Sequence, residues 1–265
     1  MKETIPKLIV QFRSWILITV IASGLLAFTV SLFLPKEYLS EASVLPANSK
    51  MMDKQAMFGS NIQELYSAYG EAEDLDRLMA TLHSPTVLQF VSDSLDLSSH
   101  YNVKGEDAGR RAMVRLTKHV TLNRSEYGEI KIKVWDKDPG KAQDIAALIL
   151  SRTQQVYDEM FAGYYDRSIN RLEKEYQVIL TDTSQGATST NSSDLELVRN
   201  RIAEYRMARL NPPAAIFILA RPEKTVLPDK PDVAFNTVFA ALVGLFTVMA
   251  WITATHIWKS GYAKP

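Results

Sequence analysis

Residues Val233–Trp258, VAFNTVFAALVGLFTVMAWITATHIW, form an apolar stretch of 26 residues without a formal charge. A helix needs about 20 mostly apolar residues to cross the hydrocarbon core of a bilayer, so this stretch is long enough. Towards the other end of the sequence, Trp15–Pro35 contains 21 residues without a formal charge and meets the same requirement. The pattern predicts two transmembrane helices that flank everything between them.

These two stretches divide the chain into five segments. We expect residues 1–14 to be a cytoplasmic N-terminus, 15–35 the first transmembrane helix, 36–232 a periplasmic domain, 233–258 the second transmembrane helix and 259–265 a cytoplasmic tail. The middle segment has 197 residues, which is enough for one domain with its own core.

Basic residues beside the spans predict the orientation. Lys2, Lys7 and Arg13 precede the first span, and Lys259 and Lys264 follow the second. Cytoplasmic flanks of membrane helices carry an excess of Lys and Arg, so both termini are assigned to the cytoplasm. A cleaved signal peptide is the alternative for the first span. Its apolar region is longer than the usual 7–15 residues, and the second span needs a partner if both termini are inside.

The composition excludes several classes of function. The formal net charge is zero and the pI is about 6.9, which gives no reason to expect nucleic acid as a partner. Cysteine is absent, and this excludes disulfides, thiolate metal sites and a cysteine nucleophile. The sequence also contains no phosphate-loop, nucleophile-elbow, zinc-protease or calcium-loop motif.

The remaining chemistry-bearing residues form no catalytic pattern. The four histidines show no metal-ligand spacing: His83, His100, His119 and His256. An acidic cluster reads as a solvated helix segment rather than paired catalytic carboxylates: Glu71, Glu73, Asp74 and Asp76. We therefore expect no enzyme activity, no metal and no cofactor.

The middle segment predicts an α+β domain with a small mixed or antiparallel sheet. Ser84 suits a helix N-cap and Pro85 the first helical position. Ile130, Ile132 and Val134 alternate with polar or bulky neighbours, as in a half-buried strand. The expected elements are a strand over 39–47, helices over 61–82, 85–95 and 106–116, a β-hairpin of 119–123 with 129–135, a helix after Asp138-Pro139, and a strand over 214–220.

Two apolar stripes predict a protruding helical hairpin. The first follows Gly163 and the second follows a polar stretch, Thr181–Ser193, which reads as a mobile loop of about 13 residues. Spacings of three and four residues within each stripe are typical of helices packed side by side. The stripes contain Ile169, Leu172, Tyr176 and Ile179, then Leu195, Val198, Ile202 and Tyr205. The alternative is two separate amphipathic helices packed on the core.

Small residues recur at four-residue spacing within both spans. Ser23 precedes Ala27, and Ala240 precedes Gly244. Pairs of this kind let membrane helices approach closely, so we expect these faces to take part in helix packing.

Three segments together resemble the Wzz-type polysaccharide co-polymerases, the chain-length determinants of bacterial surface polysaccharides. The first is Pro35-Lys36-Glu37-Tyr38, after the first span. The second is Ile130–Pro139, a strand followed by Asp138-Pro139 and a helix. The third is a proline-rich segment before the second span, followed by a glycine within that span: Ala220, Pro222, Pro228, Pro231 and then Gly244. The fixed φ of proline makes this third segment stiff and extended.

The resemblance implies a function without catalysis. Proteins of this family assemble as closed rings of identical subunits and set the length of a polysaccharide, O-antigen or a related polymer, that a separate inner-membrane polymerase makes. The implied partners are further copies of the chain, that polymerase, the lipid bilayer and lipid-linked polysaccharide. The sequence names neither the polymer nor the subunit number, nor the residues that contact the polymerase.

A second hypothesis has the same membrane topology but assigns the chain a different function. The chain would then be a two-span periplasmic sensor or adaptor, for example the membrane activator of a separately encoded tyrosine kinase in capsule or exopolysaccharide export. A membrane-anchored hydrolase is a third reading, and it lacks a catalytic constellation.

Overall fold

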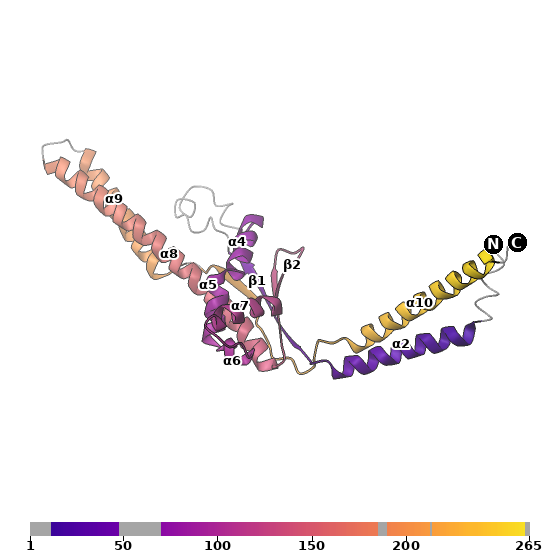
Figure 1. Cartoon of the computed structure of the whole chain (residues 1–265). Helices are drawn as coiled ribbons and strands as arrows, with labels where there is room; N and C mark the ends of the chain where they lie inside the picture. The colour runs from indigo at the N-terminus through magenta and orange to yellow at the C-terminus, as the bar shows by residue number, and fades with distance from the viewer. Residues whose placement is uncertain (1–11, 48–69, 185–189, 213, 263–265) are drawn as a thin grey trace. The chain divides into compact units, whose positions relative to one another are not determined.

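The computed structural model describes residues 12–47, 70–184, 190–212 and 214–262 of the chain (Figure 1). Within it, the chain divides into two compact units. The membrane unit draws on Met1–Leu39, Lys137–Pro139 and Thr225–Pro265, and the α+β unit on Ser40–Asp136 and Gly140–Lys224.

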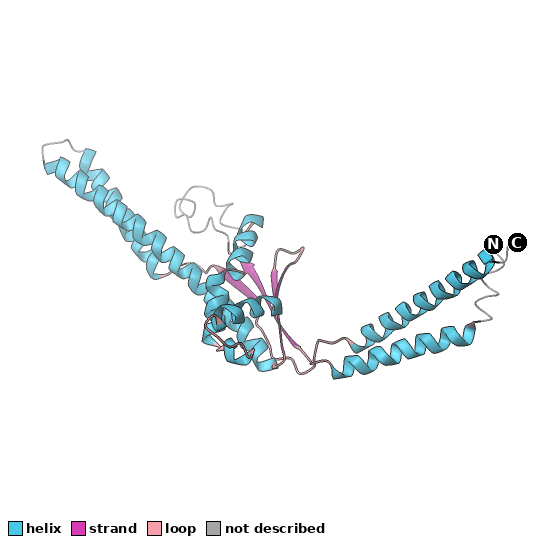
Figure 2. Ribbon diagram, in the orientation of Figure 1, coloured by secondary structure: helices cyan, strands magenta, loops and turns pink. Residues whose placement is uncertain are grey.

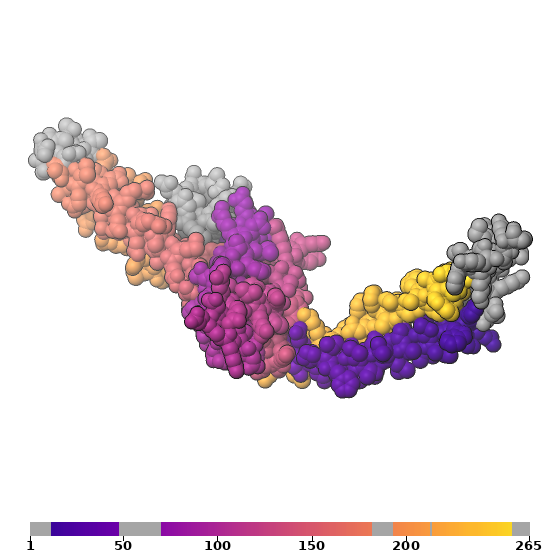
Figure 3. All heavy atoms as spheres, viewed as in Figure 1, coloured from indigo at the N-terminus to yellow at the C-terminus, as the bar shows by residue number. Residues whose placement is uncertain are grey.

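The membrane unit contains two helices, α2 (Arg13–Phe33) and α10 (Val233–Tyr262). Both α2 and the Val233–Thr255 part of α10 are long and apolar enough to cross a membrane. The helices lie side by side along their length, as the indigo and yellow atoms of Figure 3 show. We refer to α2 and α10 as the membrane helix pair.

The α+β unit is built on a four-stranded sheet in the order β2–β3–β1–β4. Its strands are the magenta arrows of Figure 2. Strands β1 and β4 pair antiparallel, as do β2 and β3. The strands are β1 (Tyr38–Pro46), β2 (Val120–Arg124), β3 (Ile130–Asp136) and β4 (Ile216–Ala220). The α+β class predicted from the sequence is confirmed.

The described residues of the α+β unit also contain six helices. They are α4 (Ala72–Leu82), α5 (Pro85–Ser94), α6 (Leu97–His100), α7 (Ala108–His119), α8 (Pro139–Ser184) and α9 (Thr190–Leu210). Helix α5 begins as expected, because the Ser84 side chain accepts a hydrogen bond from the Val87 amide and Pro85 occupies the first turn.

One core joins the sheet to its helices. The strand alternation holds in β3, where Ile130, Ile132 and Val134 are fully buried. Ile145 and Ile149, one turn apart in the first part of α8, belong to the same buried cluster. The sheet thus fixes the start of α8, and the rest of that helix extends away from the sheet beside α9 (Figure 1).

Within the described residues, the helix predicted over 61–82 covers Ala72–Leu82. Residues 61–69 lie outside the described residues, and α4 starts at Ala72. The Gly70 amide donates to the carbonyl of Pro46 at the end of β1, at 2.9 Å, so this part of the chain follows the sheet instead of a helix. A Cβ on Gly70 would lie 2.7 Å from the Cβ of Asp74, so only glycine fits there.

The acidic cluster in α4 is not uniformly solvated, which corrects the sequence reading. Asp74 is buried, and its Oδ2 accepts a hydrogen bond from the Glu71 amide at 3.0 Å. This arrangement satisfies an amide at the start of the helix, which otherwise has no partner within the helix. Asp74 therefore has a structural role in capping α4.

The polar break in the helical hairpin is shorter than predicted. Helix α8 continues to Ser184 and α9 begins at Thr190, while residues 185–189 lie outside the described residues. The hydroxyl of Thr181 donates to the Gln177 carbonyl at 2.8 Å, one turn earlier in α8. Hydrogen bonds of this kind let threonine and serine remain in a helix, so their abundance did not mark its end.

Candidate functional site

In the membrane unit, the segment that follows α2 is hydrogen-bonded to the segment that precedes α10, next to the start of β1. The Glu37 amide donates to the Lys230 carbonyl at 3.0 Å, and the Lys230 amide donates back to the Glu37 carbonyl at 3.2 Å. Their side chains form an ion pair, with Lys230 Nζ 3.5 Å from Glu37 Oε2. We call these contacts, together with the hydrogen bonds that Asp229 and Thr225 make to Glu37 and Leu39, the clasp.

Two further hydrogen bonds extend the clasp. The Asp229 amide donates to the Glu37 carbonyl at 2.9 Å. The Thr225 hydroxyl donates to the Leu39 carbonyl at 2.8 Å. These hydrogen bonds tie the segment after the first span to the segment before the second span. The two membrane helices are therefore joined at this end.

The motif prolines occupy different environments along this segment. Pro222 is buried, and its carbonyl accepts a hydrogen bond from Gln143 Nε2 at 3.3 Å in the α+β unit. Pro228 is exposed and Pro231 is half-buried. Two other motif prolines flank elements, since Pro35 follows α2 and Pro139 is the first residue of α8, directly after Asp138. Tyr38 begins β1 and Ala220 ends β4.

Asp232 caps α10, a role that sequence reasoning missed. Its Oδ1 accepts a hydrogen bond from the Phe235 amide at 2.9 Å, and its carbonyl accepts from Asn236 at 3.0 Å. An aspartate directly before a long apolar run is an N-cap signal that the sequence did carry. Because Asp232 follows Pro231, the proline-rich segment ends where the helix is fixed.

Small residues bring the membrane helix pair into close contact. A Cβ placed on Gly244 would lie 2.3 Å from Ser23 Oγ and 3.0 Å from Ser23 Cβ. Sequence reasoning selected both residues, together with Ala27 and Ala240, which are half-buried. It missed Gly24, which is buried and whose added Cβ would contact Thr237 and Ala241 on α10.

One polar contact joins the same two helices. Asn236 Nδ2 donates to Ser31 Oγ at 2.9 Å, and Ser31 is buried. Inside a bilayer water does not compete for such groups, so the hydrogen bond orients the two helices. The signal was present in the sequence, because Asn236 is an amide side chain near the start of the second apolar stretch and Ser31 lies four residues after Ala27.

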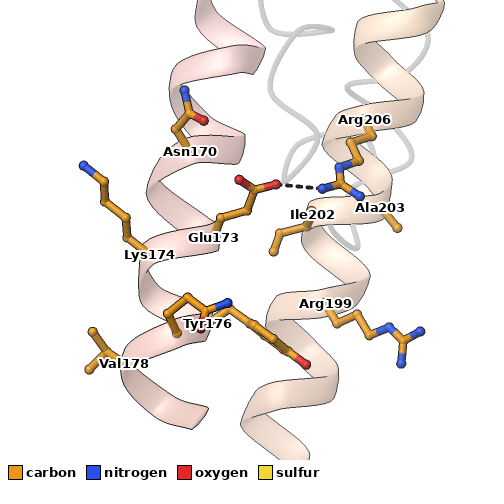
Figure 4. A pocket seen from close by; sticks show the side chains of 10 residues that line it. Asn170, Glu173, Lys174, Tyr176, Val178, Arg199, Ile202, Ala203 and Arg206 are labelled. Atoms are coloured by element: carbon orange, nitrogen blue, oxygen red, sulfur yellow. Dashed lines mark hydrogen bonds and ion pairs between the residues drawn. The ribbon is translucent and has the colours of Figure 1, made fainter. Parts of the chain in front are cut away.

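The helical hairpin is the second region that the sequence singled out. Helices α8 and α9 enclose a separate buried cluster of Ile169, Leu172, Val198 and Ile202, with Tyr176, Ile179 and Tyr205 packed against it. Leu195 is half-buried. On its outer side, Arg206 Nη2 pairs with Glu173 Oε1 at 2.7 Å across a shallow groove (Figure 4).

A polar pair with one buried member lies elsewhere in the α+β unit. His100 Nε2 lies 2.9 and 3.0 Å from the two carboxylate oxygens of Asp136, which is 2% exposed. Burial beside this carboxylate raises the pKa of the Tyr101 hydroxyl well above its ordinary value. Among the described residues there is no group of three or more His, Cys, Asp or Glu side chains that could hold a metal ion.

One protein family matches part of the chain. The family Wzz, chain length determinant protein, matches residues 5–95 of the chain. The resemblance inferred from the sequence is confirmed over residues 5–95. This segment, from the first span through β1 to α5, carries the sequence pattern of the Wzz chain length determinants. No curated protein sequence matches the chain.

Several solved structures are similar to the chain at low sequence identity. A full-length bacterial polysaccharide co-polymerase is 13% identical, with 98% of this chain and 99% of that one covered and a TM-score of 0.43. A fragment of WzzB, a polysaccharide co-polymerase from Salmonella Typhimurium, is 10% identical, with 74% and 100% covered and a TM-score of 0.46. A point mutant of the Shigella flexneri lipopolysaccharide O-antigen chain-length regulator WzzBSF is 11% identical, with 73% and 100% covered and a TM-score of 0.30.

Proposed function

We propose that this chain is a non-enzymatic co-polymerase of the bacterial inner membrane, which regulates the length of a surface polysaccharide made by a separate polymerase. The observation that carries the proposal is the chain length determinant match over residues 5–95. The two apolar helices and the clasp support it, because they give the chain two membrane anchors joined at the start of its sheet.

The proposed topology places both termini in the cytoplasm and the α+β unit in the periplasm. It follows from the basic residues that flank the two apolar stretches in the sequence. Reporter fusions at Met1 and Pro265 should both report cytoplasm. A reporter inserted at Tyr127, a 91% exposed residue in the turn between β2 and β3, should report periplasm. A periplasmic C-terminus would remove the two-span arrangement.

The proposed active form is a ring of identical subunits that acts beside the polymerase and its lipid-linked product. Light scattering of extracts in mild detergent should give particles of several times the 29.8 kDa mass of one chain. A clean monomer at micromolar concentration would contradict the ring.

The test of function is the length distribution of the polymer itself. In a host that makes the polysaccharide, we expect deletion of the gene to leave polymer synthesis intact but to change the ladder of lengths on a gel. The wild-type gene should restore the original distribution. Loss of all polymer would indicate an essential synthetic role instead, and an unchanged ladder would argue against length control.

The proline-rich segment offers a second test. Replacing Pro228 and Pro231 by alanine adds two amide donors and frees two φ angles just outside the second span. Neither change adds charge to a membrane helix, so the variant should insert and accumulate normally. If this segment transmits length control, the length distribution should shift or broaden while polymer continues to be made.

A further inference from the structure

Two large aliphatic side chains lie almost fully exposed in the membrane unit, between the clasp residues Thr225 and Asp229. Val226 and Leu227 are 88% and 79% exposed. Apolar surface in water is unfavourable in proportion to its area, and two adjacent exposed aliphatic residues indicate a contact that forms outside the chain. We refer to these two residues as the apolar loop.

The clasp holds the apolar loop from both sides. On one side, the Thr225 hydroxyl is bonded to the Leu39 carbonyl at 2.8 Å. On the other, the Asp229 amide is bonded to the Glu37 carbonyl at 2.9 Å. Only three residues separate these anchors, so the backbone that carries Val226 and Leu227 is tied at both ends.

The apolar loop also lies close to the ends of both membrane helices along the chain. Glu37, which anchors it, is four residues beyond the end of α2, a reach of at most about 14 Å in an extended chain. The headgroup region on each side of a bilayer is roughly 5–8 Å thick. Phe33 and Leu34, at the end of α2, are themselves 85% and 46% exposed.

We propose that Val226 and Leu227 insert into the periplasmic surface of the bilayer beside the membrane helix pair. The inference rests on the two-span topology of the proposed function. A bilayer is the occupant that fits, because the loop belongs to the same unit as two helices whose exposed faces are apolar. The charged clasp residues Glu37 and Lys230 would then lie at the headgroups, where a long basic side chain such as that of Lys230 is favourable. The loop would fix the depth at which the clasp sits.

The absence of cysteine makes this proposal directly testable. Single variants Leu227→Cys, Leu26→Cys and Leu210→Cys carry the label at sites with similar exposure in the structure: 79%, 69% and 75%. Leu26 is in α2 and serves as the reference for a lipid-facing site, while Leu210 at the end of α9 is the reference for water. Each full-length variant is labelled with an environment-sensitive fluorophore and reconstituted into phosphatidylethanolamine and phosphatidylglycerol vesicles.

The expected result is a lipid signature at position 227. Its emission should shift towards the blue, and nitroxides attached to lipid headgroups should quench it several-fold more strongly than they quench the label at 210. A soluble quencher that acts on 227 as strongly as on 210 would overturn the proposal. Protection from both quenchers would also overturn it, because a second copy or another part of the chain would then cover the loop.

This experiment fails independently of the proposed function. It uses purified protein in vesicles, whereas length control is measured with the wild-type gene in cells. A label at position 227 that the soluble quencher reaches, combined with normal control of polymer length in cells, would reject only the loop insertion. A lipid-inserted label combined with no effect on polymer length would reject only the co-polymerase role.

Discussion

The membrane helix pair and the helical hairpin are both made of two antiparallel helices, yet they place their residues in opposite ways. Between α2 and α10, small residues such as Gly24 and Gly244 face the partner helix, and large ones such as Leu26 and Phe246 are exposed. Between α8 and α9, Leu172 and Ile202 are buried and charged residues face outward.

The difference follows from the solvent that each pair meets. In water, burial of apolar surface drives helices together, so the large side chains point inward. Lipid is as apolar as a leucine side chain and supplies no such force. Membrane helices therefore associate through close packing and hydrogen bonds, for which small side chains are needed. The comparison predicts that added side-chain volume destabilises the membrane helix pair, whereas removed side-chain volume destabilises the helical hairpin.

The largest effect is expected where volume is added to the membrane helix pair. Gly244→Leu places atoms where Ser23 Oγ already lies, 2.3 Å from the first added carbon, so α2 and α10 must separate or shift. We expect a large fall in the thermal stability of the detergent-solubilised protein. Val243→Leu is the matched control, because Val243 is 48% exposed on the same helix. Equal stability of the two variants would contradict close packing of α2 and α10 at Gly244.

In the hairpin, loss of volume should be the damaging change. Ile202→Ala removes buried methyl groups from the cluster between α8 and α9, and we expect a loss of about 2–4 kcal/mol of unfolding free energy. Leu197→Ala, in the same helix but at a 52% exposed position, should cost much less. Chemical denaturation followed by circular dichroism checks this. A hairpin that tolerates Ile202→Ala as well as Leu197→Ala would not be held by that cluster.

A smaller effect is expected from the polar contact between the spans. Asn236→Ala and Ser31→Ala both remove the hydrogen bond of 2.9 Å, and a double-mutant cycle should give a coupling of roughly 1 kcal/mol. Thr247→Ala provides the control, because the Thr247 hydroxyl bonds only one turn back, to the Val243 carbonyl of its own helix. Zero coupling would show that packing alone orients the helices.

The exposed ion pair of the hairpin should matter less still. Glu173 and Arg206 are 43% and 63% exposed, so solvent screens their attraction. We expect Glu173→Gln to cost at most about 1 kcal/mol, and the cost to shrink further as salt is added. A large loss of stability that does not depend on salt would instead mean that the Glu173–Arg206 pair at the groove in Figure 4 holds α8 and α9 together.

The smallest predicted effect concerns pH. A hydrogen bond from the Ser43 hydroxyl, ahead of the nearby Lys131 charge, lowers the pKa of Glu129. A carboxylate with a lowered folded-state pKa stabilises the protein above its unfolded-state pKa of about 4.3, and this stabilisation is lost as the pH falls through the lower folded-state value. The stability difference between wild type and Ser43→Ala should therefore persist at neutral pH and shrink in acid.

Much of this arrangement could be predicted from the sequence, because patterns of period two and 3.6 report burial directly. The buried face of β3 and the stripe from Ile169 to Ile179 are examples. Contacts between distant segments were harder. That Asn236 meets Ser31 depends on how two apolar helices rotate against each other, and their exposed leucines and phenylalanines carry no amphipathic pattern. Gly70 was likewise unpredictable, because its reason is the close approach of Asp74 in the folded chain.

The role of the membrane helix pair in length control can be measured from the polymer itself. The length distribution made with Gly244→Leu is compared with those of Val243→Leu and wild type at equal expression. If close packing of the membrane helix pair transmits length control, Gly244→Leu should still allow polymer to be made but should shift or broaden its lengths. Val243→Leu should leave the distribution as in wild type. Identical distributions for all three proteins would contradict the account.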